Sequence, residues 1–292
     1  MSRESCEIVD TYPDFTNYWK TARLKDLDEQ IRLWKDSYMK RFPALLRKQI
    51  QCYEADGIDW KGIAKKILPL MPQRLPMMGK ARDKILSTCG LIYEKASEKL
   101  GFDFRIVFII YVGLGCGAGW ATTYNKQPSI LLGLENIAEE GWCTKGKIEG
   151  LLCHEIGHLV HMKWRNQWAA FEIAAEDPVF RLYEEGFGQR CEHIVRGKET
   201  WHMKPDREWL AWCGRHRGWL AKEFLTRLER QASVNDFFGS WFNIEGKKQT
   251  GYFLGHEFIK ELQKTLSLRK IALLSAQEVR ILGIKYLSSI CG

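Results

Sequence analysis

At residues 153–159 the chain reads Cys-His-Glu-Ile-Gly-His-Leu, which contains the pattern His-Glu-x-x-His. The apolar residues around this pattern recur at helical spacing, so we expect it to lie on an amphipathic helix. Side chains four positions apart on a helix are neighbours, which places the imidazoles of His154 and His158 on one face. Two such imidazoles can bind one Zn²⁺, and Glu155 is then held where it can accept a proton from a water molecule at the metal. The stretch therefore predicts a catalytic zinc site.

A catalytic zinc site needs a third protein ligand. One known arrangement would place a third histidine six residues after His158, but that position is Trp164. His161 comes too early to match and is expected to be a packed or supporting residue. The better candidates are the adjacent carboxylates Glu184 and Glu185, which lie on a separate predicted helix. Either carboxylate could face the two histidines across a metal ion.

The pattern at residues 154–158, combined with Glu-Gly-Phe at residues 185–187, resembles the gluzincins. These are zinc peptidases whose third ligand is a glutamate on a second helix. The resemblance covers about residues 104–260 and is nearest to the small predicted zinc-protease families of that group. It implies that Glu185 is the third ligand, because this glutamate directly precedes Gly-Phe, and Glu184 stays the alternative. Glu155 would be the general base of peptide hydrolysis.

The chain also departs from the family pattern. The gap of 26 residues between His158 and Glu185 is longer than in the aminopeptidase branch, and Gly188 stands where alanine is common. In thermolysin-like relatives a carboxylate four residues after the ligand orients the first histidine, but here that position is Gln189. Gln189 is either a hydrogen-bonding substitute for that carboxylate or a solvent-facing residue.

Further catalytic candidates follow from the same resemblance. Related enzymes place a tyrosine or histidine downstream of the ligands to donate a hydrogen bond to the developing oxyanion. Tyr252 is the first candidate here, and His256, four residues later, is the second; a buried tyrosine with a satisfied hydroxyl is the structural alternative. The sequence Gly-Leu-Glu-Asn at 133–136 is similar to the motif by which aminopeptidases hold a substrate's amino group, which makes Glu135 a candidate for that role. The remaining histidines, including His193 and His202, show no ligand spacing.

The patterns along the chain predict a mostly helical α+β fold, in which a zincin-like catalytic unit with a small sheet spans residues 101–292. A helical N-terminal layer is expected over residues 1–100, either as a separate region or within one continuous domain. The resemblance to gluzincins implies an edge strand that pairs with an extended substrate, and residues 119–124 or 129–134 are the candidates; the alternative is that both are plain sheet strands. The expected elements are helices within 18–70, at 81–100 and from 147 onward, and strands at 104–112, 120–124 and 129–134. The glycines at 113–119 form a flexible turn; they loosely fit a dinucleotide-binding fingerprint, but no helical pattern follows them.

The composition of the chain argues against nucleic-acid binding, membrane binding and a disulfide framework. The chain has 292 residues, 45% of them hydrophobic and 27% charged, and its formal net charge of +8 is spread along the sequence. This balance is typical of a globular protein and gives no reason to expect nucleic acid as a partner. The longest apolar run, 106–116, is too short to cross a membrane, and the charged N-terminus is unlike a signal peptide, so we expect a cytoplasmic protein that does not bind membranes. The nine cysteines never form Cys-x-x-Cys, which favours buried, reduced thiols over a disulfide framework.

Two functions are compatible with these sequence features. The first is a zinc-dependent peptidase that acts on a peptide or protein substrate. The alternative is a non-catalytic, zinc-containing module that binds a peptide or protein in its cleft. The presence of Glu155 favours the enzyme, because a purely structural zinc site needs no base. The oligomeric state is not predicted.

Overall fold

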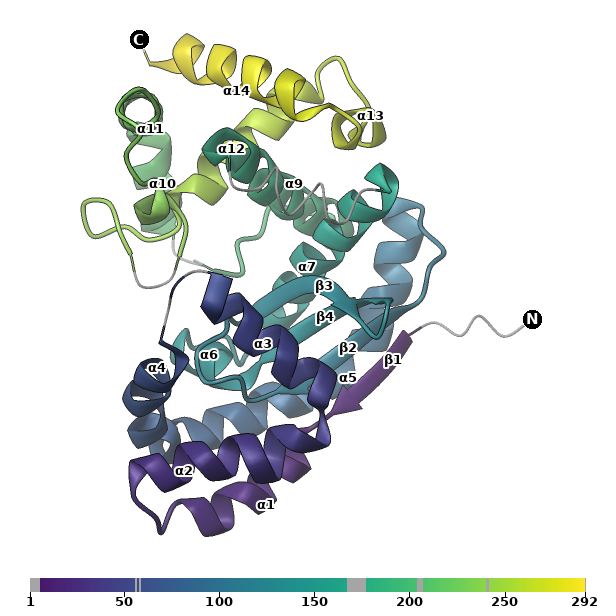
Figure 1. Cartoon of the computed structure of the whole chain (residues 1–292). Coiled ribbons are helices and arrows are strands. Elements are labelled where there is room, and N and C mark those ends of the chain that lie inside the picture. The colour runs from purple at the N-terminus through teal and green to yellow at the C-terminus, as the bar shows by residue number, and fades with distance from the viewer. Residues whose placement is uncertain are drawn as a thin grey trace. The chain divides into compact units, whose positions relative to one another are not determined.

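The structure is a computed structural model that describes residues 6–55, 57, 59–166, 177–203, 207–239 and 242–291 (Figure 1). The chain divides into two compact units, Met1–Glu155 and Ile156–Gly292. The boundary falls within one continuous helix, α7 (Lys145–Arg165), which carries the His-Glu-x-x-His pattern. In the part of the chain that the structure describes, no helix has the length and apolar character needed to span a membrane.

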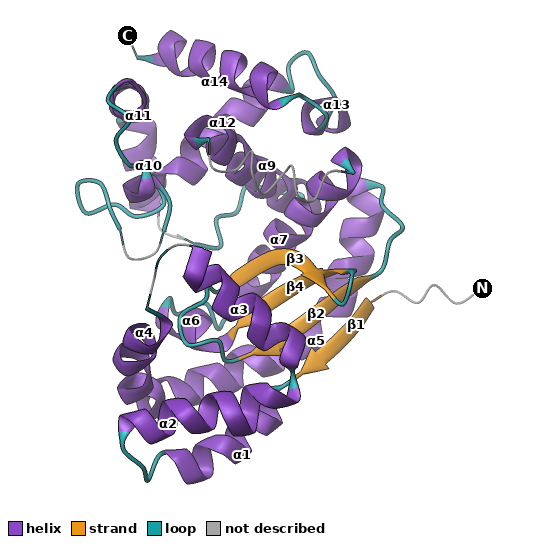
Figure 2. Ribbon diagram, viewed as in Figure 1, coloured by secondary structure: helices purple, strands orange, loops and turns teal. Residues whose placement is uncertain are grey.

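Unit 1 contains a four-stranded mixed sheet in the order β1-β2-β4-β3 (Figure 2). Strands β1 and β4 run parallel to β2, whereas β3 pairs with β4 in the antiparallel sense and forms one free edge. The β3–β4 connection is a tight hairpin at Asn125 and Lys126, which both have positive φ, as expected for a two-residue turn that matches the twist of the strands. The strands are β1 (Cys6–Asp10), β2 (Ile106–Tyr111), β3 (Gly119–Tyr124) and β4 (Gln127–Gly133).

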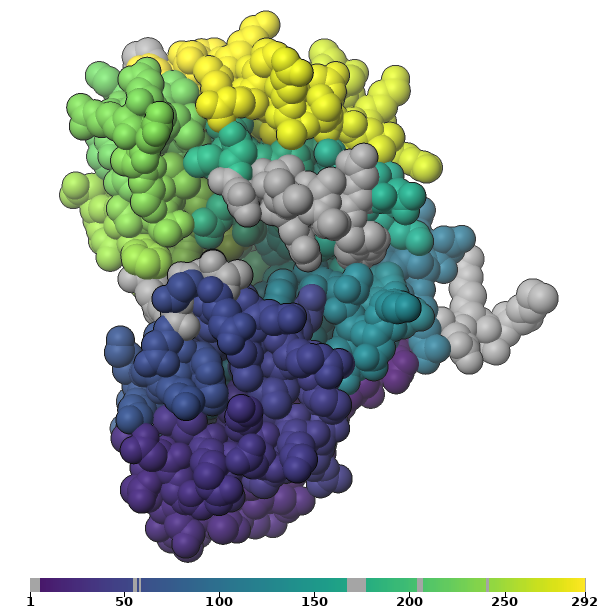
Figure 3. All heavy atoms as spheres, in the orientation of Figure 1, coloured from purple at the N-terminus to yellow at the C-terminus, as the bar shows by residue number. Residues whose placement is uncertain are grey.

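Most helices of unit 1 precede the sheet strands β2 to β4 in the chain, and the atoms of the first of these helices form the purple and indigo area in Figure 3. Helix α3 lies over the sheet, where the Lys48 ammonium is 5.0 Å from the centre of the Trp120 ring on β3. The helices are α1 (Tyr12–Ala22), α2 (Leu27–Leu33), η1 (Trp34–Tyr38), η2 (Met39–Arg41), α3 (Pro43–Ala55), α4 (Trp60–Ile67), η3 (Leu68–Leu70), α5 (Met71–Leu100) and α6 (Leu134–Glu139).

The described residues of unit 2 are helical apart from their connections. Helices α9 and α12 form its centre and touch through glycines, because a Cβ atom on Gly186 would lie only 2.1 Å from the carbonyl carbon of Gly255. The helices after α7 are α9 (Pro178–Arg196), α10 (Arg207–Arg215), α11 (Arg217–Glu229), η4 (Asn235–Phe237), α12 (Thr250–Leu262), α13 (Leu268–Ala272) and α14 (Ala276–Ile290).

These elements confirm the mostly helical α+β class with a small sheet and the expected strands of that sheet. Two local expectations are wrong. The N-terminal region is not only helical, because residues 6–10 form β1 beside β2. The helix expected at 81–100 begins at Met71, since Pro72 stands in its first turn, where the missing N–H is not needed. The zincin-like arrangement and a division near residue 100 stay predictions.

Candidate metal centre

The histidines of the motif lie one turn apart on α7 and are almost fully buried, with His154 3% and His158 7% exposed. Each offers one ring nitrogen to a group that also contains a carboxylate oxygen of Glu185, and these ligand atoms all lie within 4.8 Å of one another. The predicted helix is therefore confirmed, and so is a largely buried cluster of two histidines and one glutamate that has the composition of a possible metal site.

Both candidate carboxylates of α9 lie near His158, but on different sides of its ring. Glu185 Oε2 is 3.5 Å from Nε2, whereas Glu184 Oε1 is 3.9 Å from Nδ1. The two ring nitrogens point in different directions, so a metal ion held at Nε2 would have Glu185, and not Glu184, as the carboxylate on its side of the ring. Among the described residues, the metal-capable group on this side of His158 contains Glu185 and not Glu184.

Small residues bring the later part of α7 close to α9. A Cβ atom on Gly157 would lie 2.6 Å from the Cβ of Cys191 and 3.2 Å from the Cα of Gly188. Helix α9 begins at Pro178 after its N-cap Asp177, whose side chain accepts hydrogen bonds from the first backbone amides of the helix. The glycine inside the His-Glu-x-x-His pattern thus permits the short distance between His158 and Glu185.

Glu155 lies against the free edge of the sheet in unit 1. Its Oε2 accepts a hydrogen bond of 3.0 Å from the backbone N–H of Ala121 on β3. In an antiparallel pair of strands, hydrogen-bonded and non-hydrogen-bonded residue pairs alternate, and Ala121 with Ile130 is a non-hydrogen-bonded pair when counted from the hairpin. The N–H of Ala121 therefore points away from β4, toward the outer edge of the sheet. A Cβ atom on Gly119 would lie 2.5 Å from Oε1 of Glu155, which means that glycine at 119 leaves the space for this carboxylate.

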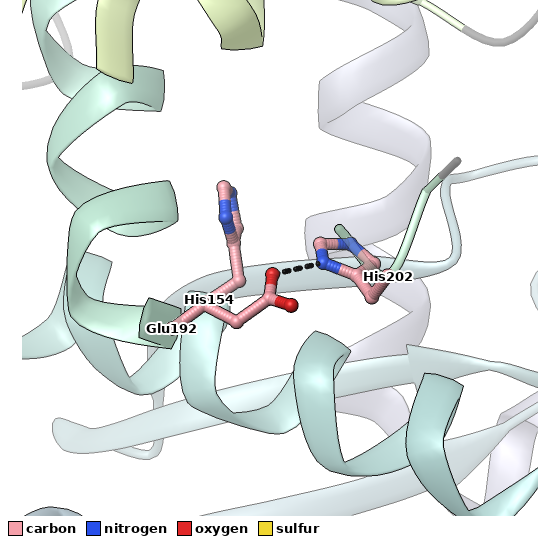
Figure 4. Close-up of side chains that lie close together, drawn as sticks. All are labelled: His154, Glu192 and His202. Carbon is pink, nitrogen blue, oxygen red and sulfur yellow. Dashed lines mark hydrogen bonds and ion pairs between the residues drawn. The ribbon is translucent and has the colours of Figure 1, made fainter. Parts of the chain in front are cut away.

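A second group of possible ligands shares His154. It adds Glu192 of α9 and His202, and its ligand atoms also lie within 4.8 Å of one another (Figure 4). Glu192 is fully buried, and its Oε2 is 2.8 Å from Nδ1 of His202. Spacing along the sequence does not select His202. One sequence signal does point to Glu192, because it follows Glu185 by seven residues and so shares its face of the helix.

Gln189 is fully buried, so the solvent-facing alternative is wrong. Its amide nitrogen donates hydrogen bonds to Glu192 Oε2, at 3.1 Å, and to the carbonyl of Thr200, at 2.7 Å. The expected packed role of His161 is confirmed: its ring is fully buried, stacks on Phe187 and has Nε2 3.0 Å from the Tyr183 hydroxyl.

The two oxyanion candidates lie on α12, which confirms the expected helix there. The half-buried ring of Tyr252 packs against Phe238. His256 is buried, and its ring centre is 4.3 Å from that of His193 and 5.2 Å from that of Trp201. Burial lowers the pKa of His256 and lowers the pKa of His193 to about 3, so both rings are neutral at pH 7. The roles of Tyr252 and His256 in stabilising an oxyanion stay predictions.

Glu135 has a defined structural contact. The side chain is fully buried, and its Oε1 accepts a hydrogen bond of 2.9 Å from the backbone N–H of Gly115 in the glycine-rich turn. Burial raises the pKa of this carboxyl group, against the opposing effect of the backbone donors. Its role in binding a substrate amine stays a prediction.

Comparisons of the chain with protein-family models, with curated proteins and with solved structures found no significant match. No family membership is therefore shown. The case for a metal centre rests on the sequence motif and on the geometry of the described side chains.

Proposed function

We propose that the chain is a zinc-dependent peptidase of the gluzincin type, in which His154, His158 and Glu185 bind Zn²⁺ and Glu155 is the general base. The grouping of these three ligand atoms within 4.8 Å is the observation that carries the proposal. Ligands bound to one tetrahedral zinc at about 2.1 Å lie about 3.4 Å apart. His158 Nε2 and Glu185 Oε2 are 3.5 Å apart, so this pair fits a zinc ion with little movement. Two imidazoles and one carboxylate are also a donor set typical of catalytic zinc.

The reaction would be the hydrolysis of a peptide bond. A bound Zn²⁺ supplies a Lewis acid that activates a water molecule and polarises the scissile carbonyl. Glu155 accepts the proton of the attacking water and passes it to the leaving amine. Its carboxylate lies beside the outward-facing amide of Ala121, so a substrate strand paired with β3 would pass next to the base. The free edge of β3 thus supports a peptide or an extended protein segment as the substrate.

One contact favours the alternative of a non-catalytic binding module. The hydrogen bond from the Ala121 N–H gives Glu155 a structural role, because this bond links β3 to α7. Glutamine at position 155 would keep an acceptor oxygen for this bond but could not act as a base. The substitution Glu155→Gln therefore separates the two functions.

The metal assignment can be tested by zinc content after dialysis. We expect about one zinc per chain in the wild type and almost none in His154→Ala or His158→Ala, because a site with two remaining ligands binds weakly. Glu185→Gln should lower zinc affinity strongly, whereas the matched variant Glu184→Gln should change it little. If Glu184→Gln shows the larger loss, Glu184 is the ligand.

The activity can be tested with a broad peptide library that contains free and blocked N-termini. We expect Glu155→Gln to retain zinc and to lose peptide hydrolysis by a factor on the order of 10² or more. Cleavage restricted to free N-termini would support a role for Glu135 in binding the amine. A wild-type protein that holds zinc and cleaves no peptide would favour the binding module instead.

A further inference from the structure

The two faces of strand β3 meet different helices of unit 1. Side chains alternate along a strand, so Gly119 and Ala121 share one face and Trp120 lies on the other. The face of Gly119 is turned toward α7, because a Cβ atom there would lie 2.8 Å from Cδ1 of Leu151. The face of Trp120 is turned toward α3, which crosses the sheet in Figure 2 and contacts this ring through Lys48. A peptide paired with the free edge of β3 would thus direct its side chains alternately toward α7 and toward α3.

Lys48 supplies a positive charge on the α3 side of this edge. Its ammonium is 5.0 Å from the centre of the Trp120 ring, which is within the range of a cation–π contact. This contact holds the ammonium over the indole but does not neutralise it. Among the described residues, Lys48 makes this ring contact and no ion pair, and its neighbours one turn earlier on α3, Ala44 and Leu45, are uncharged. Because the Lys48 side chain is only half-buried, its charge is available to an anionic group of a bound peptide.

The register of β3 indicates which part of a bound peptide would meet Lys48. Trp120 with Leu131 is a hydrogen-bonded pair, so the backbone groups of Trp120 point toward β4 and those of Ala121 point outward. In a peptide strand at this edge, the side chain opposite Ala121 would lie on the α7 face, beside Glu155. The side chains one position before and after it would lie on the α3 face. Opposite side chains of neighbouring strands have Cβ atoms about 4.5–5.5 Å apart, so a carboxylate beside Trp120 can reach the Lys48 ammonium.

We propose that Lys48 is a specificity-determining residue, which selects peptides that carry an aspartate or glutamate next to the residue opposite Ala121. This inference rests on the proposed function, because it specifies the extended peptide that β3 would bind. Trp120 holds the ammonium beside the edge and offers an apolar surface to the methylene groups of the acidic side chain. The substrate class is thus an extended peptide with an acidic side chain one position away from the residue beside the base.

The preference should be moderate and sensitive to salt, because the ion pair would form at a partly exposed edge. Ion pairs at exposed positions change an equilibrium constant by up to about fivefold. We therefore expect glutamate to be favoured over glutamine, which has the same size and no charge, by about fivefold at low salt. The Debye length falls from about 10 Å at 0.1 M salt to about 3 Å at 1 M, so the preference should become smaller at 1 M salt.

The test uses short, uncharged peptides in which one glutamate is moved along the sequence, each with a matched peptide that carries glutamine instead. We measure kcat/KM for hydrolysis by the zinc-loaded wild type, and Kd for binding to the zinc-loaded variant Glu155→Gln, which is expected to have little turnover. Both measurements should favour glutamate by about fivefold at a position next to the residue opposite Ala121. Lys48→Met should abolish this preference, and Lys48→Glu should replace it with a preference for lysine over glutamine.

Two control variants separate charge from packing. Lys48→Arg keeps the charge and should keep the preference, whereas Arg47→Met removes the neighbouring exposed cation and should leave the preference unchanged. Equal hydrolysis and equal binding of the glutamate and glutamine peptides, or a preference that persists in Lys48→Met, would overturn the proposal.

The two measurements also separate this inference from the proposed function. Binding that depends on Lys48, without hydrolysis by the wild type, would support the role of Lys48 and refute the peptidase. Hydrolysis without a preference for glutamate would refute the role of Lys48 alone. A chain that neither binds nor cleaves any of these peptides would refute both.

Discussion

The substitution Gly119→Ala tests whether the position of the Glu155 carboxylate matters for catalysis. The added Cβ atom would lie 2.5 Å from Glu155 Oε1 and 2.8 Å from Cδ1 of Leu151. Ordinary contact begins at about 3.4 Å, so the carboxylate oxygen must move away by about 0.9 Å. Both contacted atoms are the far ends of flexible side chains, so we expect unit 1 to fold and the zinc ligands to stay in place.

We expect Gly119→Ala to lower the rate of peptide hydrolysis. A displacement of about 1 Å in a reacting group can lower the rate by a factor on the order of 10². We therefore expect kcat/KM for peptide hydrolysis to fall by about that factor in Gly119→Ala, while the zinc content stays near one per chain and the Tm changes by a few degrees at most. The assay is the initial rate on the best substrate of the peptide library, with zinc measured on the same sample.

A matched control lies on α7 itself. A Cβ atom on Gly146 would meet no atom within 4 Å, so Gly146→Ala should keep full activity, with a small gain in stability from the higher helix propensity of alanine. Full activity in Gly119→Ala with normal zinc content would refute the reasoning, because it would show that a displaced Glu155 carboxylate still supports hydrolysis. Loss of zinc in Gly119→Ala would refute the expectation that this substitution moves the Glu155 carboxylate without disturbing the zinc ligands.

Three further predictions address the two helices beside the site and the buried histidines. Tyr252→Phe should lower kcat about tenfold with little change in KM if its hydroxyl stabilises the oxyanion, and unchanged kinetics would assign it to packing. Gly157→Ala should lower the free energy of unfolding by about 1–3 kcal/mol and weaken zinc binding, because its Cβ would lie 2.6 Å from the Cβ of Cys191; urea titration and a chelator competition measure both effects. Burial lowers the pKa of His193 from 6.5 to about 3, so protonation of this ring favours the unfolded state. The stability that the neutral ring provides is fully present above pH 6.5 and is lost as the pH falls toward 3. Urea unfolding of the zinc-free chain should therefore show a stability loss of about 2 kcal/mol between pH 7 and pH 5 from this residue, and His193→Gln should reduce that loss.

The parts of the fold that local sequence predicts are those whose signal lies within one element. The β-branched and aromatic run at 106–111 forms a strand that is buried along its length, and periodic apolar residues around the motif form α7. Strand β1 has no such signal, because Glu7 and Asp10 make it polar, and it exists through pairing with β2, about 100 residues later. Proline at position 72 is ambiguous in the sequence, because it can mark the end of one helical region and is equally typical of the first turn of the next helix.

The same distinction applies to the candidate site. Spacing on one helix predicts His154, Glu155 and His158, because side chains four positions apart must be neighbours. His202 lies outside any helix, and its position next to Glu192 depends on the fold of the segment after α9, which carries no periodic pattern. The fine position of Glu155 also depends on Gly119, a residue of a different element, which no local pattern links to the motif.

The two groups that share His154 differ in their access to water, and this difference favours the group with Glu185 as the catalytic one. The Glu192 side chain has no exposed surface and that of His202 is 4% exposed, whereas the Glu185 side chain is 19% exposed. A catalytic zinc must keep one position open for water or substrate, which a fully enclosed group does not offer.

The buried carboxylate of Glu192 needs polar partners to offset the loss of water, and it has them in His202, at 2.8 Å, and in the side-chain amide of Gln189. We therefore expect Glu192→Gln to retain zinc but to weaken zinc binding by about 10–100-fold. The reason is that Glu192 and His202 would orient the His154 ring without binding the metal, while Glu185 would be the third ligand. Complete loss of zinc in Glu192→Gln, with normal zinc in Glu185→Gln, would reverse this assignment.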